Sequence, residues 1–174
     1  VDYSNEQLTM LRRFGLSAYF GDATRPDLLH AAGIEEADVF VIAIDNKEAA
    51  TELARYMREH HPKVHVVARA IDRWHVYDLW SAGCRDIIRE TYDSSIRAAR
   101  STFEAIGHSR EEAEKLIGIF EEFDRRTMVE TAQAFIESDD PLSENSSYSK
   151  LIRENLQVWE QDLKVAMKKA REGA

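Results

Sequence analysis

The sequence predicts an α/β protein: a Rossmann-like, doubly wound parallel sheet that lacks its first strand and glycine-rich loop in this chain, followed by a helical C-terminal extension. Three observations predict this fold. Short apolar segments alternate with helical ones at intervals of about 20 residues up to residue 92, which is typical of βαβ units. Beyond residue 92 the apolar residues recur only at helical spacing. Finally, 7 Gly and 3 Pro in 174 residues are too few for a turn-dense all-β fold.

The segments nearest the N-terminus predict a helix between two strands. Residues 1–3 have the character of a strand end, and Ser4 with Gln7 forms a capping-box pattern that starts a helix over 5–14. A short strand follows over 17–20. Because the central strand and phosphate loop of such a sheet would precede this segment, we expect the chain to be a piece of a longer protein.

The next segments complete the predicted sheet. The 39–44 segment is apolar at every position, as expected for a parallel strand that is covered on both faces. Asn46 is placed to cap the helix that follows it. In order, we expect a helix over 26–33, a strand over 39–44, a helix over 46–60, a strand over 64–69, a helix over 72–82 and a strand over 86–88.

Only helices are expected in the second half of the chain. One apolar stripe stops at Gly107, and a second capping box at Ser109 and Glu112 opens a long helix. The serine-rich stretch 138–149 has no periodicity and is predicted to be a linker. The last helix carries an apolar stripe that needs a partner surface, so dimerisation through the late helices and packing within one chain both stay open.

The composition excludes several classes of protein. The net charge of −9 gives no electrostatic footprint for nucleic acid or an anionic membrane. A mean hydropathy of −0.47, with no apolar run near the length of about 18 residues that a membrane helix needs, predicts no membrane span within this sequence. The single cysteine, Cys84, cannot form an internal disulfide, which agrees with a reducing compartment.

A polar turn follows the 17–20 strand at the edge where a doubly wound sheet meets its ligand. This turn is Gly21-Asp22-Ala23-Thr24. The Asp22 carboxylate can accept hydrogen bonds from an adenine amino group or a ribose hydroxyl, and the small Ala23 lets a base lie close. The alternative is that Asp22 or Thr24 only caps the following helix.

Two more acids stand at equivalent positions. Asp45 follows Ala43 and Ile44 at the end of the next predicted strand and adds a second carboxylate to the same rim, with helix capping again as the alternative. Asp2 ends a strand that precedes a helix, which is where dinucleotide-binding folds place the acid that binds a ribose diol.

No catalytic or metal-binding pattern is found along the chain. His60, His61, His65 and His75 lack partners at metal-ligand spacing, so we interpret them as solvated or packing side chains and predict no metal site. Cys84 has no obvious activating base and is expected to be a small, half-buried residue before a strand. We therefore predict that the chain is not an enzyme.

The motifs, in order and at the expected spacing, resemble the cytosolic regulatory domain of Kef-type, glutathione-gated potassium efflux systems. That family belongs to the wider potassium-conductance-regulating, TrkA-N-like group that binds NAD or a related nucleotide. The resemblance runs over residues 1–136. The motifs that carry it are Arg13-Phe14-Gly15, Tyr19-Phe20-Gly21-Asp22-Ala23-Thr24-Arg25-Pro26, Ala43-Ile44-Asp45, Ala68-Arg69-Ala70 and Arg89-Glu90-Thr91.

The resemblance implies a homodimeric gate of a proton-coupled potassium antiporter, at the cytoplasmic face of the bacterial inner membrane, with its transmembrane domain upstream. Each unit would bind NAD(H) or AMP. Glutathione would hold the gate shut, and glutathione conjugates would open it. The implied division is a partial Rossmann nucleotide-binding domain (1–92), a helical dimerisation and ligand-sensing region (93–137), and a linker with a C-terminal amphipathic helix (138–174).

The resemblance also implies roles for particular residues. Family glutathione contacts correspond to Phe14, Arg89 and Asp124, and the Arg89 guanidinium can grip a glutathione carboxylate in a bidentate pair. Family nucleotide contacts correspond to Asp2, Asp22, Ala23, Ala43, Ile44, Asp45 and Arg69.

Two other functions stay open: a fragment of an NAD-dependent oxidoreductase, and a nucleotide-binding dimerisation module with no thiol response.

Overall fold

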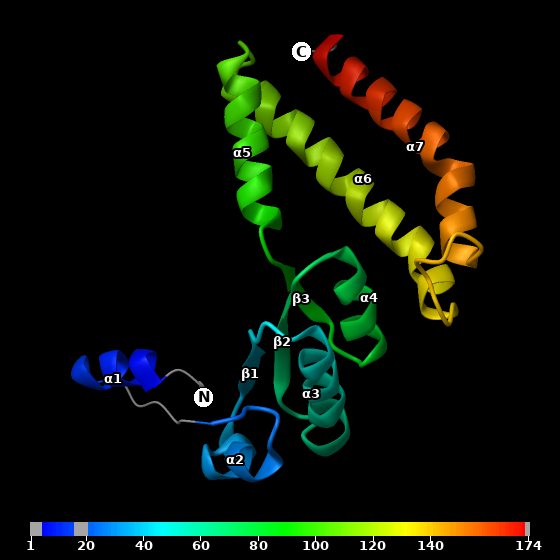
Figure 1. Cartoon of the computed structure of the whole chain (residues 1–174). Helices are drawn as coiled ribbons and strands as arrows, with labels where there is room; N and C mark the ends of the chain where they lie inside the picture. The colour runs from blue at the N-terminus through cyan, green and yellow to red at the C-terminus, as the bar shows by residue number, and fades with distance from the viewer. Residues whose placement is uncertain (1–4, 16–20, 173–174) are drawn as a thin grey trace. The chain divides into compact units, whose positions relative to one another are not determined.

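The computed structural model describes residues 5–15 and 21–172, except for the side chains of Asn5, Gln7 and Arg12. The chain divides into two compact units, Val1–Arg89 and Glu90–Ala174. The first unit contains the sheet, and the described part of the second consists of helices (Figure 1). The predicted strand over 17–20, the capping box at Ser4 and the candidate Asp2 lie outside the described residues.

The described part of the first unit contains a three-stranded parallel sheet. The strands are β1 (Val39–Ile42), β2 (His65–Ala70) and β3 (Asp86–Arg89), in the order β1-β2-β3. Val39 pairs with His65, and Val67 with Asp86. The alternation of apolar and helical segments therefore predicted the parallel sheet correctly, with shifts of one or two residues at the strand ends.

Two helices cover one face of this sheet. They are α3 (Lys47–His60), which connects β1 to β2, and α4 (Arg73–Ser81), which connects β2 to β3 (Figure 1). A cluster of buried side chains lies beneath them, and burial of its apolar surface stabilises the unit. Its larger members are Leu29, Ile34, Ile42, Leu53, Met57 and Leu79.

The other face of the sheet is uncovered among the described residues. Val39 is 52% exposed and Val41 is 63% exposed, whereas Ile42 is buried. The expectation that both faces of the 39–44 strand are covered is therefore not met, and the strand itself ends at Ile42. The reason is topological: the strand order runs in one direction, and right-handed crossovers in one direction put every connecting helix on the same face.

Local signals place the helix ends of this unit. The α1 helix (Asn5–Arg13) precedes Gly15, whose φ is 75°. Pro26 begins α2 (Pro26–Ala31), at a position where its missing N–H costs little. A short 3₁₀ helix, η1 (Ile34–Glu36), leads to β1. Asn46 caps α3 as predicted, since its side chain accepts a hydrogen bond from Ala49 N at 2.8 Å.

The second unit contains three helices in its described part: α5 (Tyr92–Ala105), α6 (Arg110–Ile136) and α7 (Ser147–Glu172). The predicted capping box is present, because Ser109 Oγ accepts from Glu112 N and the Glu112 carboxylate accepts from Ser109 N. The α7 helix packs along α6, with Phe135 and Tyr148 in edge-to-face contact at 5.2 Å. Part of the predicted 138–149 linker is helical, because α7 begins at Ser147. None of the described helices is both long and apolar enough to span a bilayer.

Candidate functional site

The carboxyl ends of β1 and β2 are joined by one side chain. Arg69, near the end of β2, donates from Nη2 to Asp45 Oδ1 at 2.5 Å and to the backbone carbonyl of Ala43 at 3.2 Å. Arg69 is thus brought to two other residues predicted to form the binding rim, which precede it by 24 and 26 positions in the sequence. We call this end of the sheet the carboxyl edge.

The pair at this edge is asymmetric in exposure. The Asp45 side chain is 97% exposed, while that of Arg69 is 29% exposed. The guanidinium is therefore held against the strand ends, and the carboxylate stands in solvent with accepting capacity left for a hydroxyl or amino group of a ligand. Ile44, also predicted here, is half-buried and packs against the core.

The Gly21-Asp22-Ala23-Thr24 turn is closed by its own aspartate. Asp22 Oδ1 accepts from Thr24 N at 2.9 Å and from Thr24 Oγ1 at 2.6 Å. The residue that precedes α2 is Arg25, which makes no side-chain capping bond. The simple alternative, that Asp22 or Thr24 caps α2, is therefore not what the structure shows.

Gly21 fixes this turn tightly against the helix that follows. Its φ is 147°, and a Cβ added there would lie 2.7 Å from Leu28 Cδ2. Any side chain at this position would displace Leu28 of α2. The backbone of the turn therefore lies close against a side chain of α2.

A second polar cluster at the start of α3 and α4 was not identified from the sequence. Lys47, the first residue of α3, hydrogen-bonds the carboxylate of Asp72, which also accepts from His75 N at 2.9 Å as the cap of α4. Partial burial opposes ionisation of Asp72, but the bonds from Lys47 and His75 N outweigh it and lower its pKa. Burial lowers the pKa of His75 and raises that of Asp78. The capping position of Asp72 is a local signal, whereas its pairing with Lys47 depends on the fold.

The residues expected to contact glutathione are spread over both units. Arg89 is the last residue of β3 and pairs in register with Ala70, so it belongs to the carboxyl edge. Phe14 follows α1 and is 71% exposed. Asp124 is buried on α6 in the other unit, where its backbone carbonyl accepts from Thr127 Oγ1 at 3.1 Å. Their meeting in one site stays a prediction.

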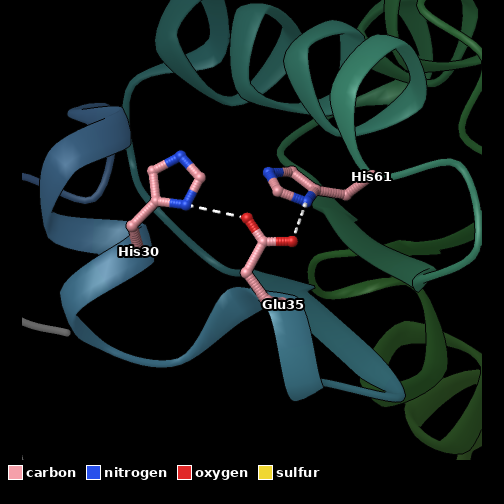
Figure 2. Close-up of side chains that lie close together, drawn as sticks. All are labelled: His30, Glu35 and His61. Carbon is pink, nitrogen blue, oxygen red and sulfur yellow. Dashed lines mark ion pairs between the residues drawn. The ribbon is translucent and has the colours of Figure 1, made fainter.

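The opposite end of the sheet holds a group of potential metal ligands that the sequence pattern did not predict. His30, Glu35 and His61 each offer a ligand atom within 4.8 Å of the other two. Figure 2 shows the Glu35 carboxylate between the two imidazole rings. The spacing along the chain matches no common metal motif, and only the fold brings His61 to the other two residues.

Cys84 lies just before β3 as predicted, but it is buried and not half-buried. Its thiol donates to Val66 O and Asp86 O at 3.5 and 3.4 Å. Burial raises the pKa of this thiol, which disfavours the reactive thiolate. Cys84 is therefore a packing residue.

Comparison with known proteins identifies the family. The TrkA-N domain matches residues 1–90. Glutathione-regulated potassium-efflux system proteins KefC from Salmonella paratyphi B and Salmonella newport are each 34% identical over 150 residues, which is 86% of this chain and 24% of the relative. The chain thus spans about a quarter of the length of these curated relatives.

A solved structure supports the same relationship. The Kef CTD of Shewanella denitrificans in AMP-bound form is 36% identical, with a TM-score of 0.69 over 76% of this chain and 80% of that one. These relatives are a potassium-efflux protein and its domain, which agrees with the prediction that the chain is not an enzyme. The chain belongs to the TrkA-N domain family and is homologous to the C-terminal domain of the Kef potassium-efflux proteins.

Proposed function

We propose that the chain is the ligand-sensing regulatory domain of a Kef-type potassium efflux system and that it binds an adenine nucleotide, AMP or NADH, at the carboxyl edge. The observation that carries this proposal is the Arg69 bridge between Asp45 and the Ala43 carbonyl. Ligands of open parallel sheets bind outside the carboxyl ends of the strands. The AMP-bound form of the Shewanella denitrificans relative supports the choice of an adenine nucleotide.

The roles of the residues follow from their chemistry. The exposed Asp45 carboxylate would accept from ribose hydroxyls or the adenine amino group, and Arg69 would hold the two strand ends at a fixed separation. Ala23 lies in the turn in which Asp22 Oδ1 accepts a hydrogen bond from Thr24 N, and its small side chain would leave room for the flat face of the base. A bound nucleotide would therefore contact β1, β2 and the turn before α2 at once. If two conformations of the domain differ in how these segments are placed, the nucleotide would favour the one that it binds better.

The wider assembly is part of the same proposal. The domain would lie at the cytoplasmic face of the membrane and form a homodimer. It would control a potassium:proton antiporter whose transmembrane part belongs to the same longer protein. Glutathione or its conjugates would bind through Phe14, Arg89 and Asp124. Arg89 supports this role because it is the last residue of β3, at the carboxyl edge, and a guanidinium can bind a ligand carboxylate in a bidentate pair.

Calorimetric titration of the 174-residue chain with AMP and with NADH tests nucleotide binding. Asp45→Asn and Arg69→Ala should each weaken binding by about 10- to 100-fold, since each removes charge-assisted hydrogen bonds worth about 1.5–3 kcal/mol. The matched control is His65→Ala, which breaks the exposed His65–Asp86 pair (3.0 Å) at the other end of the sheet. Absence of saturable binding, or an equal loss in the control, would refute the proposed site.

The glutathione response needs its own titration. Arg89→Ala should abolish affinity for glutathione and for an S-substituted glutathione and leave the affinity for AMP unchanged. If Arg89→Ala reduces both affinities equally, the pocket has been misplaced. If the unmodified chain binds AMP and ignores both thiol ligands, the domain is a nucleotide-binding module without a thiol response.

A further inference from the structure

We propose that His30, Glu35 and His61 form a binding site for a divalent transition-metal ion of the zinc type. The site lies at the amino end of the sheet, away from the carboxyl edge, and it stands apart from nucleotide binding. The inference rests on the convergence of these three side chains from separate elements, on their donor chemistry, and on one buried nitrogen that the rest of the described structure leaves unsatisfied.

The topology explains why these residues meet. His30 lies in the last turn of α2, Glu35 lies in η1 just before β1, and His61 directly follows α3 and precedes β2. Both strands are parallel and start in register, with Val39 opposite His65. The segments that enter them must therefore lie side by side at the amino end of the sheet.

The distances are close to those of a metal site before the ion binds. His30 Nδ1 lies 2.9 Å from Glu35 Oε1, and His61 Nδ1 lies 3.7 Å from Glu35 Oε2. The ring centroids of His30 and His61 are 5.7 Å apart. Ligand atoms around tetrahedral zinc are separated by about 3.3 Å, because each bond is about 2 Å long.

His61 supplies the observation that points to a ligand. The residue is only 8% exposed, and its Nε2 is buried with no hydrogen-bond partner among the described residues. In Figure 2 this nitrogen points toward His30. A buried polar atom without a partner is costly, and a metal ion bound there would satisfy it. The two ring nitrogens point to opposite sides of the imidazole, so the Glu35 carboxylate, whose Oε2 lies 3.7 Å from Nδ1, would turn away from Nδ1 to bind an ion held at Nε2.

The donor set selects the class of ion. Two imidazole nitrogens and one carboxylate oxygen are typical of zinc sites that keep a fourth position for water. Hard ions such as Mg²⁺ prefer oxygen ligands alone. We therefore assign His30 Nδ1, Glu35 Oε1 and His61 Nε2 as the three protein ligands.

An ion-pair cluster without metal is the competing arrangement. It leaves the buried His61 Nε2 without a hydrogen-bond partner among the described residues. A metal ion instead takes neutral imidazoles and uses that nitrogen. The two arrangements differ in whether the chain binds zinc.

The experiment is a calorimetric titration of the 174-residue chain, purified without a histidine tag, with ZnCl₂ and with MgCl₂. We expect one equivalent of Zn²⁺ to bind and Mg²⁺ not to bind. His30→Ala and Glu35→Gln should each weaken zinc binding at least about tenfold, because each removes a ligand. These two side chains are 48% and 60% exposed, so the variants should fold.

The control is His60→Ala, next to the site in sequence. Its ring stacks on Tyr56 at 4.3 Å and its Nδ1 lies 3.1 Å from Tyr56 O, so it is not part of the cluster. Zinc should also raise the Tm of the unmodified chain and of His60→Ala, and not that of the other two variants. No zinc binding, an unchanged affinity in His30→Ala and Glu35→Gln, or an equal loss in His60→Ala would each overturn the proposal.

Discussion

At the scale of single residues, the Lys47–Asp72 pair gives the first unit a stability that depends on pH. The Asp72 pKa lies below its ordinary value of 3.8, so the ionised form is favoured in the folded state. Its contribution is fully present above that ordinary value and is lost as the pH falls through the lowered one. The pair is partly exposed, at 38% and 30% for the two side chains, which limits its strength.

Asp72→Asn tests this pair while keeping the helix cap, since asparagine caps as well as aspartate. We expect the variant to be less stable than the unmodified chain by about 0.5–1 kcal/mol at pH 7. The difference should be smaller at pH 3, which is below the ordinary value of 3.8, because the carboxylate is then largely protonated in the unfolded chain. Urea unfolding of both proteins at the two pH values measures this. A difference that persists at pH 3 would mean that cap geometry, and not charge, is responsible.

Residue-level prediction from sequence succeeded where the signal is local. Asp45 and Arg69 each end a predicted strand, and their meeting at the carboxyl edge follows from parallel pairing alone. The sites that were missed depend on packing. Glu35 and His61 belong to segments joined only by the entry of two strands into the sheet, and no spacing along the chain encodes that contact.

At the scale of elements, the Ser109 capping box sets where the longest helix begins. Both of its hydrogen bonds are present, at 3.2 and 2.8 Å, and the bonds from Ser109 lower the pKa of Glu112. Helix α6 has 27 residues, so its first turn fixes the register of a long apolar face. The start of this helix was predictable because every interaction that sets it lies within four residues.

Ser109→Ala should therefore destabilise the second unit by about 1 kcal/mol, because one otherwise unsatisfied backbone donor of the first turn loses its partner. Thermal unfolding followed by circular dichroism measures the shift. Ser101→Ala is the matched control, since it removes a hydroxyl from an exposed position within α5. Equal losses in the two variants would show that the capping box contributes nothing.

The extent of the sheet was harder to predict than its strands. An all-apolar strand predicts cover on both faces, yet Val39 and Val41 are exposed among the described residues. An apolar strand sequence indicates that both faces of the strand should be buried, but it does not indicate which segment covers each face. That depends on strand order, which sequence pattern does not encode.

At the scale of the whole molecule, the apolar surface of the helical unit bears on oligomeric state. A groove of about 930 Å³ runs between α6 and α7 and is lined in part by Phe123, Val129, Leu163 and Val165. Val129 is 71% exposed. Exposed apolar surface of this kind is typical of an interface, which fits the homodimer proposed above.

Val129→Glu should shift the proposed dimer toward monomer, raising its dissociation constant at least about tenfold, because a charge would have to be buried in the interface. Sedimentation velocity over a range of concentrations measures this. Val158→Glu is the control, since Val158 is 57% exposed on α7 and does not line the groove. A monomeric unmodified chain, or equal effects of the two variants, would contradict dimerisation through this surface.

The short helix α2 has a consequence for how the two proposed sites communicate. It is 6 residues long, follows the Asp22 turn directly and carries His30 in its last turn. Gly21 lies close against Leu28 of this helix, because a Cβ added at Gly21 would be 2.7 Å from Leu28 Cδ2. If a nucleotide at the turn changes the affinity for zinc by some factor, zinc must change the affinity for the nucleotide by that same factor. Titrating the nucleotide with and without zinc, and zinc with and without the nucleotide, would measure this factor. A factor different from one would show that the two proposed sites are coupled, and α2 is the element that connects them.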